Sequence, residues 1–164
     1  MEERVALTTS VKHELARVPV AKTNVRAAEV ASVLRFAGGL HIISGRIALE
    51  VELDTKLAAQ RVGRDLAALY GVRAEVRVIA ASGMRRHDNY LLRVLDGETL
   101  ARQTGLMDAR RRPVRGLPNR LTTGNPEEVA AVWRGAFLAR GTLTDPGRSS
   151  SLEVVCPSNE SAMA

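Results

Sequence analysis

Arginine is the residue type in this sequence whose abundance points most directly to chemistry. Lysine and arginine together number 24 among 164 residues, against 18 acids, and only Lys12, Lys22 and Lys56 are lysine. A guanidinium binds a phosphate through two parallel hydrogen bonds, so an arginine-rich surface suits nucleic acid or an acidic protein. A GC-rich genome also raises arginine content, which leaves a purely compositional interpretation open. Aromatic residues make up only 3% of the chain, which argues against surfaces that stack unpaired bases.

Two segments concentrate the arginines. Segment 109–124 holds five of them and no acid, and its prolines and glycines are typical of a linker. The loop of a predicted hairpin holds two more. The candidates for contacts with DNA phosphates are therefore Arg85, Arg86, Arg110, Arg111, Arg112, Arg115 and Arg120. A solvated, partly flexible connection without specific contacts is an equal alternative for the linker.

Metal and cofactor chemistry has little support in the sequence. The single cysteine, Cys156, excludes an internal disulfide, and His13, His41 and His87 lack the spacing of metal ligands. We therefore expect no metal ion and no cofactor. The sequence has no run of 18 apolar residues and opens on a polar, acidic segment, which predicts a cytoplasmic protein.

The elements that would position these residues follow a regular order. The patterns predict a peripheral arm with a short helix from about Ser10, an apolar helix at 24–39, a hairpin at 40–54, a helix capped by Thr55 and ended by Gly71, a hairpin of 72–80 and 89–95, and a short helix that Asp96 caps and Gly105 ends. After the linker, Asn125 caps a helix that ends at Gly141, a strand covers 152–156, and another helix begins near Ser158.

This order divides the chain into four segments and contains an internal repeat. The segments are an arm at 1–23, a first half at 24–108, a linker at 109–124 and a partial second half at 125–164. A shift of 103 residues places Gly38 on Gly141 and Ser32 on Gly135, as pseudo-twofold symmetry would require. Small residues let two helices approach closely, so the expected helix interface comprises Ala28, Ala31, Ser32, Val132, Gly135, Ala136 and Ala139. We also expect Trp133 in the core or at this interface, and Cys156 buried.

The segment Trp133–Gly141 resembles a LAGLIDADG motif, and the order α-β-β-α-β-β-α is that of one half of the fold. Three segments, at 8–15, 34–42 and 134–146, resemble the WhiA family of sporulation transcription regulators in order and spacing. The resemblance covers the entire chain. It implies an α+β, LAGLIDADG homing-endonuclease-like fold with the start of a second pseudo-symmetric half.

The resemblance also says where catalysis would be. In active LAGLIDADG nucleases an acid precedes the terminal glycine of each motif, and the two acids hold a divalent metal beside the scissile phosphates. Those positions are Ala37 and Arg140 here, and neither side chain can ligate a metal. We therefore expect no enzyme. A surviving metal-dependent homing endonuclease and a general basic nucleic-acid-binding protein are the alternatives.

The outward face of the sheet is the DNA-binding saddle in the nuclease relatives, so its charge matters. If Val72, Ala74, Val76 and Val78 point inward, the outward residues are Glu50, Glu52, Asp54, Arg73, Glu75 and Arg77. Four acids against two arginines oppose phosphate. We favour a solvated face with cross-strand salt bridges over a DNA saddle.

The function implied by the resemblance is transcriptional regulation of sporulation and cell division. In that family a C-terminal helix-turn-helix domain carries most of the recognition of promoter DNA, and such a domain is absent from this sequence. The family is similar to regulators that act with a WhiB-type iron–sulfur protein and with RNA polymerase. The resemblance therefore implies a nucleoid-associated, non-catalytic module that serves mainly for protein docking and supports DNA binding.

Overall fold

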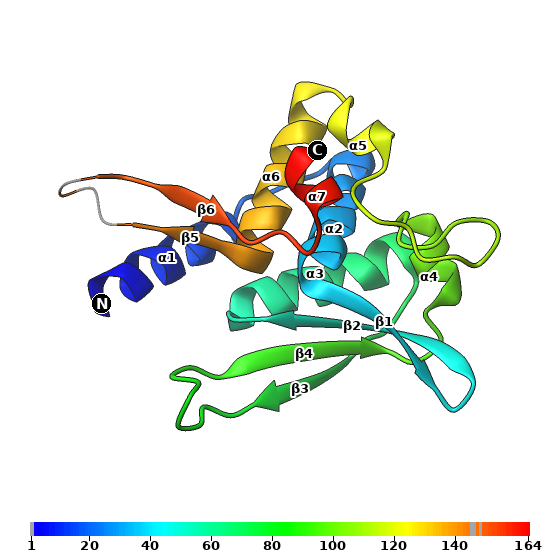
Figure 1. Ribbon diagram of the computed structural model, residues 1–164, viewed down its shortest axis with the longest axis horizontal. Helices are drawn as coiled ribbons and strands as arrows, with labels where there is room; N and C mark the ends of the chain where they lie inside the picture. The colour runs from blue at the N-terminus through cyan, green and yellow to red at the C-terminus, as the bar shows by residue number, and fades with distance from the viewer. Residues whose placement is uncertain (1, 145–146, 148) are drawn as a thin grey trace.

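The computed structural model describes residues 2–144, 147 and 149–164. Its elements are α1 (Glu2–Leu15), α2 (Thr23–Ala37), β1 (Gly38–Ile43), β2 (Arg46–Leu53), α3 (Lys56–Tyr70), β3 (Glu75–Ile79), β4 (Asn89–Val94), α4 (Glu98–Gln103), α5 (Asn119–Thr122), α6 (Pro126–Arg140), β5 (Gly141–Leu143), β6 (Leu152–Val154) and α7 (Asn159–Met163). From α2 to α4 the order is α-β-β-α-β-β-α, which confirms the predicted α+β class (Figure 1). Among the described residues no helix is both long and apolar enough to cross a membrane.

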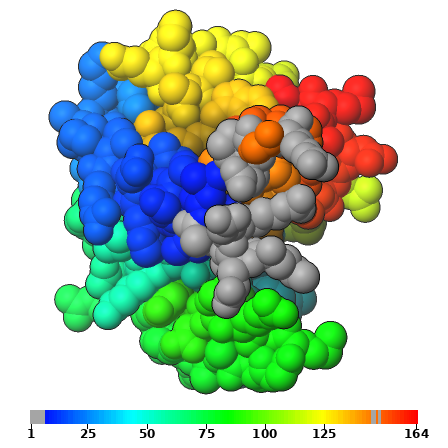
Figure 2. Space-filling view, turned by 90° about the vertical axis from the view of Figure 1, so that its left-hand side faces the viewer, coloured from blue at the N-terminus to red at the C-terminus, as the bar shows by residue number. Residues whose placement is uncertain are grey.

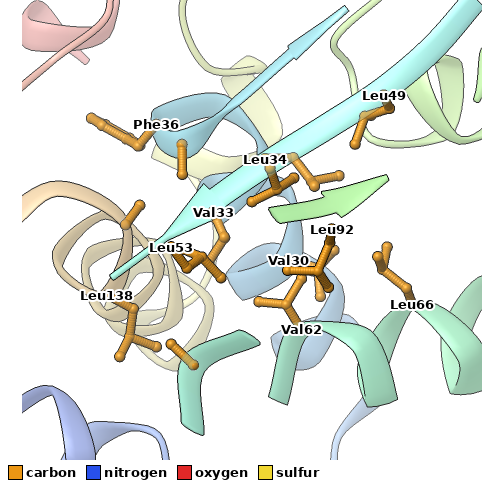
Figure 3. Packing of buried hydrophobic residues seen from close by; sticks show 14 of the residues in the cluster. Val30, Val33, Leu34, Phe36, Leu49, Leu53, Val62, Leu66, Leu92 and Leu138 are labelled. Carbon is orange, nitrogen blue, oxygen red and sulfur yellow. The ribbon is translucent and has the colours of Figure 1, made fainter. Parts of the chain in front are cut away.

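An antiparallel sheet of order β1-β2-β4-β3 carries the first half, and α2 and α3 lie on one side of it (Figure 1). We call this side the inner face. Leu49, Val51 and Leu53 of β2 alternate toward it and are buried, as the sequence pattern predicted. Figure 3 shows Leu49 and Leu53 in one apolar cluster with Val30 of α2 and Leu66 of α3. Burial of this cluster is the main force that holds the helices on the sheet.

Strand β3 has its valines on the expected face of the sheet, but that face is open there. Val76 and Val78 pair with Leu92 and Tyr90 of β4 and so share the inner face. They are nevertheless 58% and 60% exposed, because α3 packs mainly on β4 and β2 rather than on β3. The assumption that these two valines point inward is therefore confirmed, but their face is not covered, since alternation along a strand gives its face and not whether that face is covered.

Helix α1 is not a peripheral arm. It begins at Glu2 rather than near Ser10, and Lys12 on it is only 2% exposed. The Lys12 ammonium lies 2.8 Å from Asp54 at the end of β2 and 6.0 Å from the Phe137 ring centroid in α6. The Thr8 hydroxyl accepts a 3.1 Å hydrogen bond from the Leu143 amide of β5. α1 therefore joins the first half of the chain to the second, and the predicted short, peripheral helix was wrong.

Most helix ends follow the local signals. The Thr55 side chain accepts from the Ala58 amide, and Gly71 ends α3 with φ +64°. Asn125 and Glu128 form the reciprocal capping box of α6. One cap differs from the prediction, because Gly97 and not Asp96 precedes α4.

The internal repeat extends further than the two long helices. The order α2-β1-β2-α3 recurs as α6-β5-β6-α7, and the 103-residue shift that relates the glycines also places Thr55 on Ser158. Thr55 accepts from the amide three residues later, and Ser158 accepts in the same way from Ser161 at 3.3 Å. The two halves therefore share a cap as well as their helices, which confirms the start of a second pseudo-symmetric half.

Candidate functional site

The centre of the pseudo-symmetric arrangement is the crossing of α2 and α6. The Ser32 hydroxyl donates a 2.6 Å hydrogen bond to the Val132 carbonyl. Opposite it, a Cβ at Gly135 would lie 2.6 Å from the Glu29 carbonyl oxygen, so only glycine permits this approach. Because Ser32 corresponds to Gly135 and Glu29 to Val132 in the repeat, the same contact occurs twice, once as a hydrogen bond and once as a close approach.

The structure brings the residues expected at this interface together. Ala28, Ala31, Ser32, Val132, Gly135, Ala136 and Ala139 are all buried on α2 and α6. Trp133 is different, because its side chain is 62% exposed and the expectation of a core or interface position was wrong. It projects from the side of α6 that α2 does not cover. Cys156 is half-buried rather than buried.

A buried ionic cluster beside the crossing was missed by the sequence reasoning. Glu29 of α2 is 3% exposed and accepts from Arg61 of α3 at 2.6 and 3.1 Å. Arg134 of α6 donates to the same carboxylate. Arg61 also donates to the carbonyls of Ala16 and Val18, at 3.1 and 2.7 Å. One carboxylate thus connects α2, α3 and α6. Arg61 and Arg134 lie 32 and 105 positions from Glu29 in the sequence, so no local spacing could have predicted these contacts.

The ends of the two motif helices hold no carboxylate. Ala37 is buried, and Arg140 turns its guanidinium toward the backbone, donating to the carbonyls of Glu52 at 3.1 Å and Ala139 at 2.9 Å. The glycines that follow, Gly38 and Gly141, are extended with ψ 168° and 148°, so glycine is required there for space rather than for a left-handed backbone. Each helix passes directly into a strand.

These residues do not fit a divalent metal ion. A methyl group offers no lone pair, and a guanidinium carries the same sign of charge as the ion. Among the described residues no cluster of three or more His, Cys, Asp or Glu side chains could hold one either. No step through a metal ion can therefore be assigned to Ala37 and Arg140.

Ion pairs occupy the two carboxylates that β2 presents on the outer face of the sheet. Glu50 of β2 accepts from Arg93 of β4 at 2.7 Å, and His41 of β1 lies 3.8 Å from it. Glu52 accepts from Asn89 at 2.6 Å and lies 3.7 Å from Arg85. The cross-strand salt bridges expected on this face are present. An anion approaching it would meet carboxylates alternating with their own cations.

Hydrogen bonds to Asp108 hold the turn that carries the first linker arginines. Asp108 accepts from the amides of Arg110 and Arg112 at 2.8 and 2.9 Å, and from Nε of Arg112 at 3.0 Å. These hydrogen bonds hold the pKa of the Asp108 carboxyl below its usual value, and the bond from the backbone amide of Arg112 contributes most. Arg111 takes a left-handed φ of +62° and lies 2.8 Å from Glu98. The hydrogen bonds give this part of the linker a defined turn.

The seven phosphate candidates do not form one surface. Arg85 and Arg86 lie in the β3–β4 hairpin loop, and the linker arginines lie beyond the opposite end of the sheet (Figure 1). Arg120 donates to the Gln103 carbonyl at 3.1 Å. Arg115 and Arg35 line a pocket of about 520 Å³. Burial of the Arg35 guanidinium lowers its pKa.

Comparisons with known proteins agree on a family. Residues 23–107 match the model of the WhiA N-terminal LAGLIDADG-like domain, and residues 129–164 match that of the WhiA LAGLIDADG-like domain. The protein named probable cell division protein WhiA of Clavibacter michiganensis is 72% identical over 159 residues, which are 96% of this chain and 49% of that protein. Its namesake in Leifsonia xyli is 70% identical over 161 residues, 98% of this chain and 49% of that protein. The chain spans about half the length of these relatives.

Solved structures show the same fold. A crystal structure of the N-terminal LAGLIDADG domain of DUF199/WhiA has a TM-score of 0.68 and 16% identity, covering 95% of this chain and 69% of that one. Full-length DUF199/WhiA from Thermatoga maritima has a TM-score of 0.57 and 17% identity, covering 88% and 43%. Both likenesses concern the fold alone. The family models and the close relatives show that the chain belongs to the WhiA family and contains its LAGLIDADG-like region.

Proposed function

We propose that this chain is a non-catalytic LAGLIDADG-like module of a DNA-binding transcriptional regulator of sporulation and cell division, which serves mainly for protein docking and supports DNA binding. The observation that carries the proposal is Arg140. Its guanidinium stands where a nuclease would have a metal-ligating acid, and it is bound to the carbonyls of Glu52 and Ala139. The family's relatives are named as probable cell division proteins, which supports the regulatory role.

Absence of cleavage is the first consequence. Two unit charges 4 Å apart interact by about 4 kcal/mol at an effective dielectric constant of 20, so a divalent cation beside Arg140 would be strongly repelled. Incubation of supercoiled plasmid with the chain and Mg²⁺ or Mn²⁺ is expected to yield no nicked product. Nicking that disappears with Glu52→Ala or Asp54→Ala would instead support a surviving homing endonuclease.

Support of DNA binding is assigned to the exposed arginines. Arg111 and Arg112 already pair with Glu98 and Asp108, whereas Arg86 and Arg110 have no ion pair within the described part of the chain. We assign promoter recognition to the helix-turn-helix domain of the longer proteins and a sequence-independent contribution to these arginines. Each lost phosphate contact should lower the slope of log affinity against log salt by about 1.

A salt titration tests this assignment. Binding of promoter DNA by this chain and by a full-length relative is measured at two salt concentrations. Arg86→Ala with Arg110→Ala should reduce the slope, and Arg102→Ala, which removes an arginine paired with Glu98, should not. Specific binding by the chain as tight as that of the full-length protein would contradict the proposal. Loss of all affinity on replacing Arg110, Arg111 and Arg112 would favour a general basic nucleic-acid-binding protein.

Protein docking is assigned to partners of the kind the family implies, a WhiB-type iron–sulfur regulator and RNA polymerase. Trp133 offers an exposed indole on α6, and tryptophan is enriched among residues that dominate interface energies. Its fluorescence should shift on partner binding, because it is the only tryptophan in the chain. Trp133→Ala should weaken binding about 30-fold. Met84→Ala, which truncates a fully exposed side chain on the hairpin, is the matched control.

Localisation follows from the same proposal. A regulator that acts on promoters with RNA polymerase should lie in the cytoplasm and associate with the nucleoid. A fluorescent fusion of the full-length protein, imaged beside a DNA stain, is expected to overlap the nucleoid. A uniform cytoplasmic signal that does not change when transcription is inhibited would contradict this assignment.

A further inference from the structure

Strand β3 presents an unpaired edge and a row of exposed side chains. It is the last strand of the order β1-β2-β4-β3, and within the described residues only β4 pairs with it. Figure 1 shows it as the outermost strand, and Figure 2 shows the hairpin (green) at the lower side of the molecule. Its inner-face residues Val76 and Val78 are more than half exposed. An unpaired edge of this kind is a template for another strand.

Charge on the outer face of β3 distinguishes one partner strand from others. Glu75 lies opposite Arg93 of β4, and Arg93 in turn pairs with Glu50 of β2. The charges therefore alternate in sign across the sheet up to its edge at Glu75. A strand added beside β3 would continue the alternation if it placed a cation opposite Glu75 and an anion opposite Arg77.

The strand itself meets both requirements when it is paired with a second copy. In an antiparallel pairing centred on Val76, Glu75 of each copy faces Arg77 of the other, because the two residues are equidistant from Val76. The same register places Val78 opposite Ala74 on the inner face. Centring on Glu75 or on Arg77 would set like charges opposite each other, and a shift by one residue would mix apolar with charged faces.

We propose that β3 is a homodimerisation edge at which two copies of this chain pair antiparallel about Val76 to form one continuous sheet. Glu75 and Arg77 would disfavour pairing with most other strands, because charges at a sheet edge oppose strand addition. In a second copy of β3 the same two charges are complementary, so they favour the identical strand as partner. The contact is isologous, because both copies use the same strand, and it therefore gives a dimer and no larger assembly. Val76 and Val78, which α3 leaves uncovered, become partly covered by Val76 and Ala74 of the second copy.

The size of the edge sets its strength. β3 has five residues, from Glu75 to Ile79, and a stable interface usually buries about 800 Å² on each partner. The pairing is therefore transient, with a dissociation constant on the order of 100 µM. Because exposed ion pairs contribute to it, raising the ionic strength should weaken it.

Charge reversal tests the register. Sedimentation velocity of the 164-residue chain from about 10 µM to 1 mM should show a monomer–dimer equilibrium. E75R and R77E each place like charges opposite each other and should weaken dimerisation at least about tenfold. The double variant E75R/R77E restores two opposite pairs and should dimerise again. An equimolar mixture of E75R and R77E should form a heterodimer, because two arginines of one chain then face two glutamates of the other.

Controls separate the interface from the fold. R46E changes the net charge as R77E does, at an exposed position of β2 away from the edge, and should dimerise like the wild type. E75R also faces Arg93 within its own chain, so circular dichroism melting is recorded for every variant. The double variant keeps that internal clash, and its recovery would therefore report the interface alone. A wild type that stays monomeric at 1 mM, or single variants that dimerise as it does, would overturn the proposal.

Discussion

The Ser32 hydroxyl lies 2.6 Å from the carbonyl oxygen of Val132, at the point where α2 and α6 cross. Across the pseudo-twofold axis, the corresponding pair is Gly135 and Glu29, which touch without a hydrogen bond. The crossing thus keeps the close approach of a LAGLIDADG helix pair while the helix ends beyond it have lost their acids. The stability of the crossing and the proposed absence of nuclease activity can be tested separately.

Gly135→Ala should destabilise the chain, because the added methyl would lie 2.6 Å from a backbone oxygen of α2. Overpacking of this kind costs about 1–3 kcal/mol. Gly63→Ala is the matched control, since the methyl there meets only the Leu92 side chain at 3.6 Å in the middle of α3. The better helix propensity of alanine should stabilise the control by about 0.5–1 kcal/mol. Urea unfolding measures the change in the free energy of unfolding of each variant. A change of the same sign in both would contradict the geometry of the crossing.

Glu29→Gln should cost about 3–5 kcal/mol in the free energy of unfolding, because it leaves Arg61 and Arg134 buried without a counter-ion. Glu127→Gln removes the exposed partner of Lys22 and should cost less than about 1 kcal/mol. Chemical denaturation of both variants at neutral pH measures the difference. Equal losses would mean that Glu29 is as solvated as a surface carboxylate.

Asp108 should titrate below the ordinary aspartate pKa of about 3.9, because backbone amides of Arg112 and Arg110 stabilise its charged form. A carboxyl whose folded pKa is lowered adds stability above its unfolded pKa, and this stability is lost as pH falls through the folded pKa. Asp108→Asn should therefore be less stable than the wild type at pH 7 and should approach it in strong acid. Carbon-detected NMR of the carboxyl group measures the titration. A pKa at or above the ordinary value would show that the turn does not hold in solution.

Arg140→Ala should lower the stability by about 1–3 kcal/mol, because the carbonyl of Glu52 loses a charged donor. Arg140→Lys keeps the charge with a single donor group and should recover part of the loss. Neither variant is expected to gain plasmid nicking, since neither supplies a metal ligand. Calorimetry and a nicking assay on the same preparations test both statements. Unchanged stability in both variants would show that Arg140 points to solvent instead.

Local signals in the sequence determined much of the architecture. The caps at Thr55 and Asn125, the left-handed Gly71 and the 103-residue repeat each depend on neighbouring residues or on chain spacing. They were sufficient to predict the order α-β-β-α-β-β-α of the first half and the two helices that cross, and the family resemblance added the positions where the acids are missing. The length of α1, the short α5 and strand β5 were not predicted. The boundaries of the four segments and the phosphate role of the arginines remain predictions.

Tertiary packing alone decided the rest. The ion cluster of Glu29 joins residues far apart in the chain, and Trp133 is exposed because α2 covers the other side of α6. Val76 and Val78 alternate as core residues do, yet α3 packs mainly on β4 and β2 and leaves them exposed. The face of the sheet to which a side chain points follows from the two-residue period of a strand, which can be read from the sequence. Its burial depends on which element, distant in the chain, packs over that face.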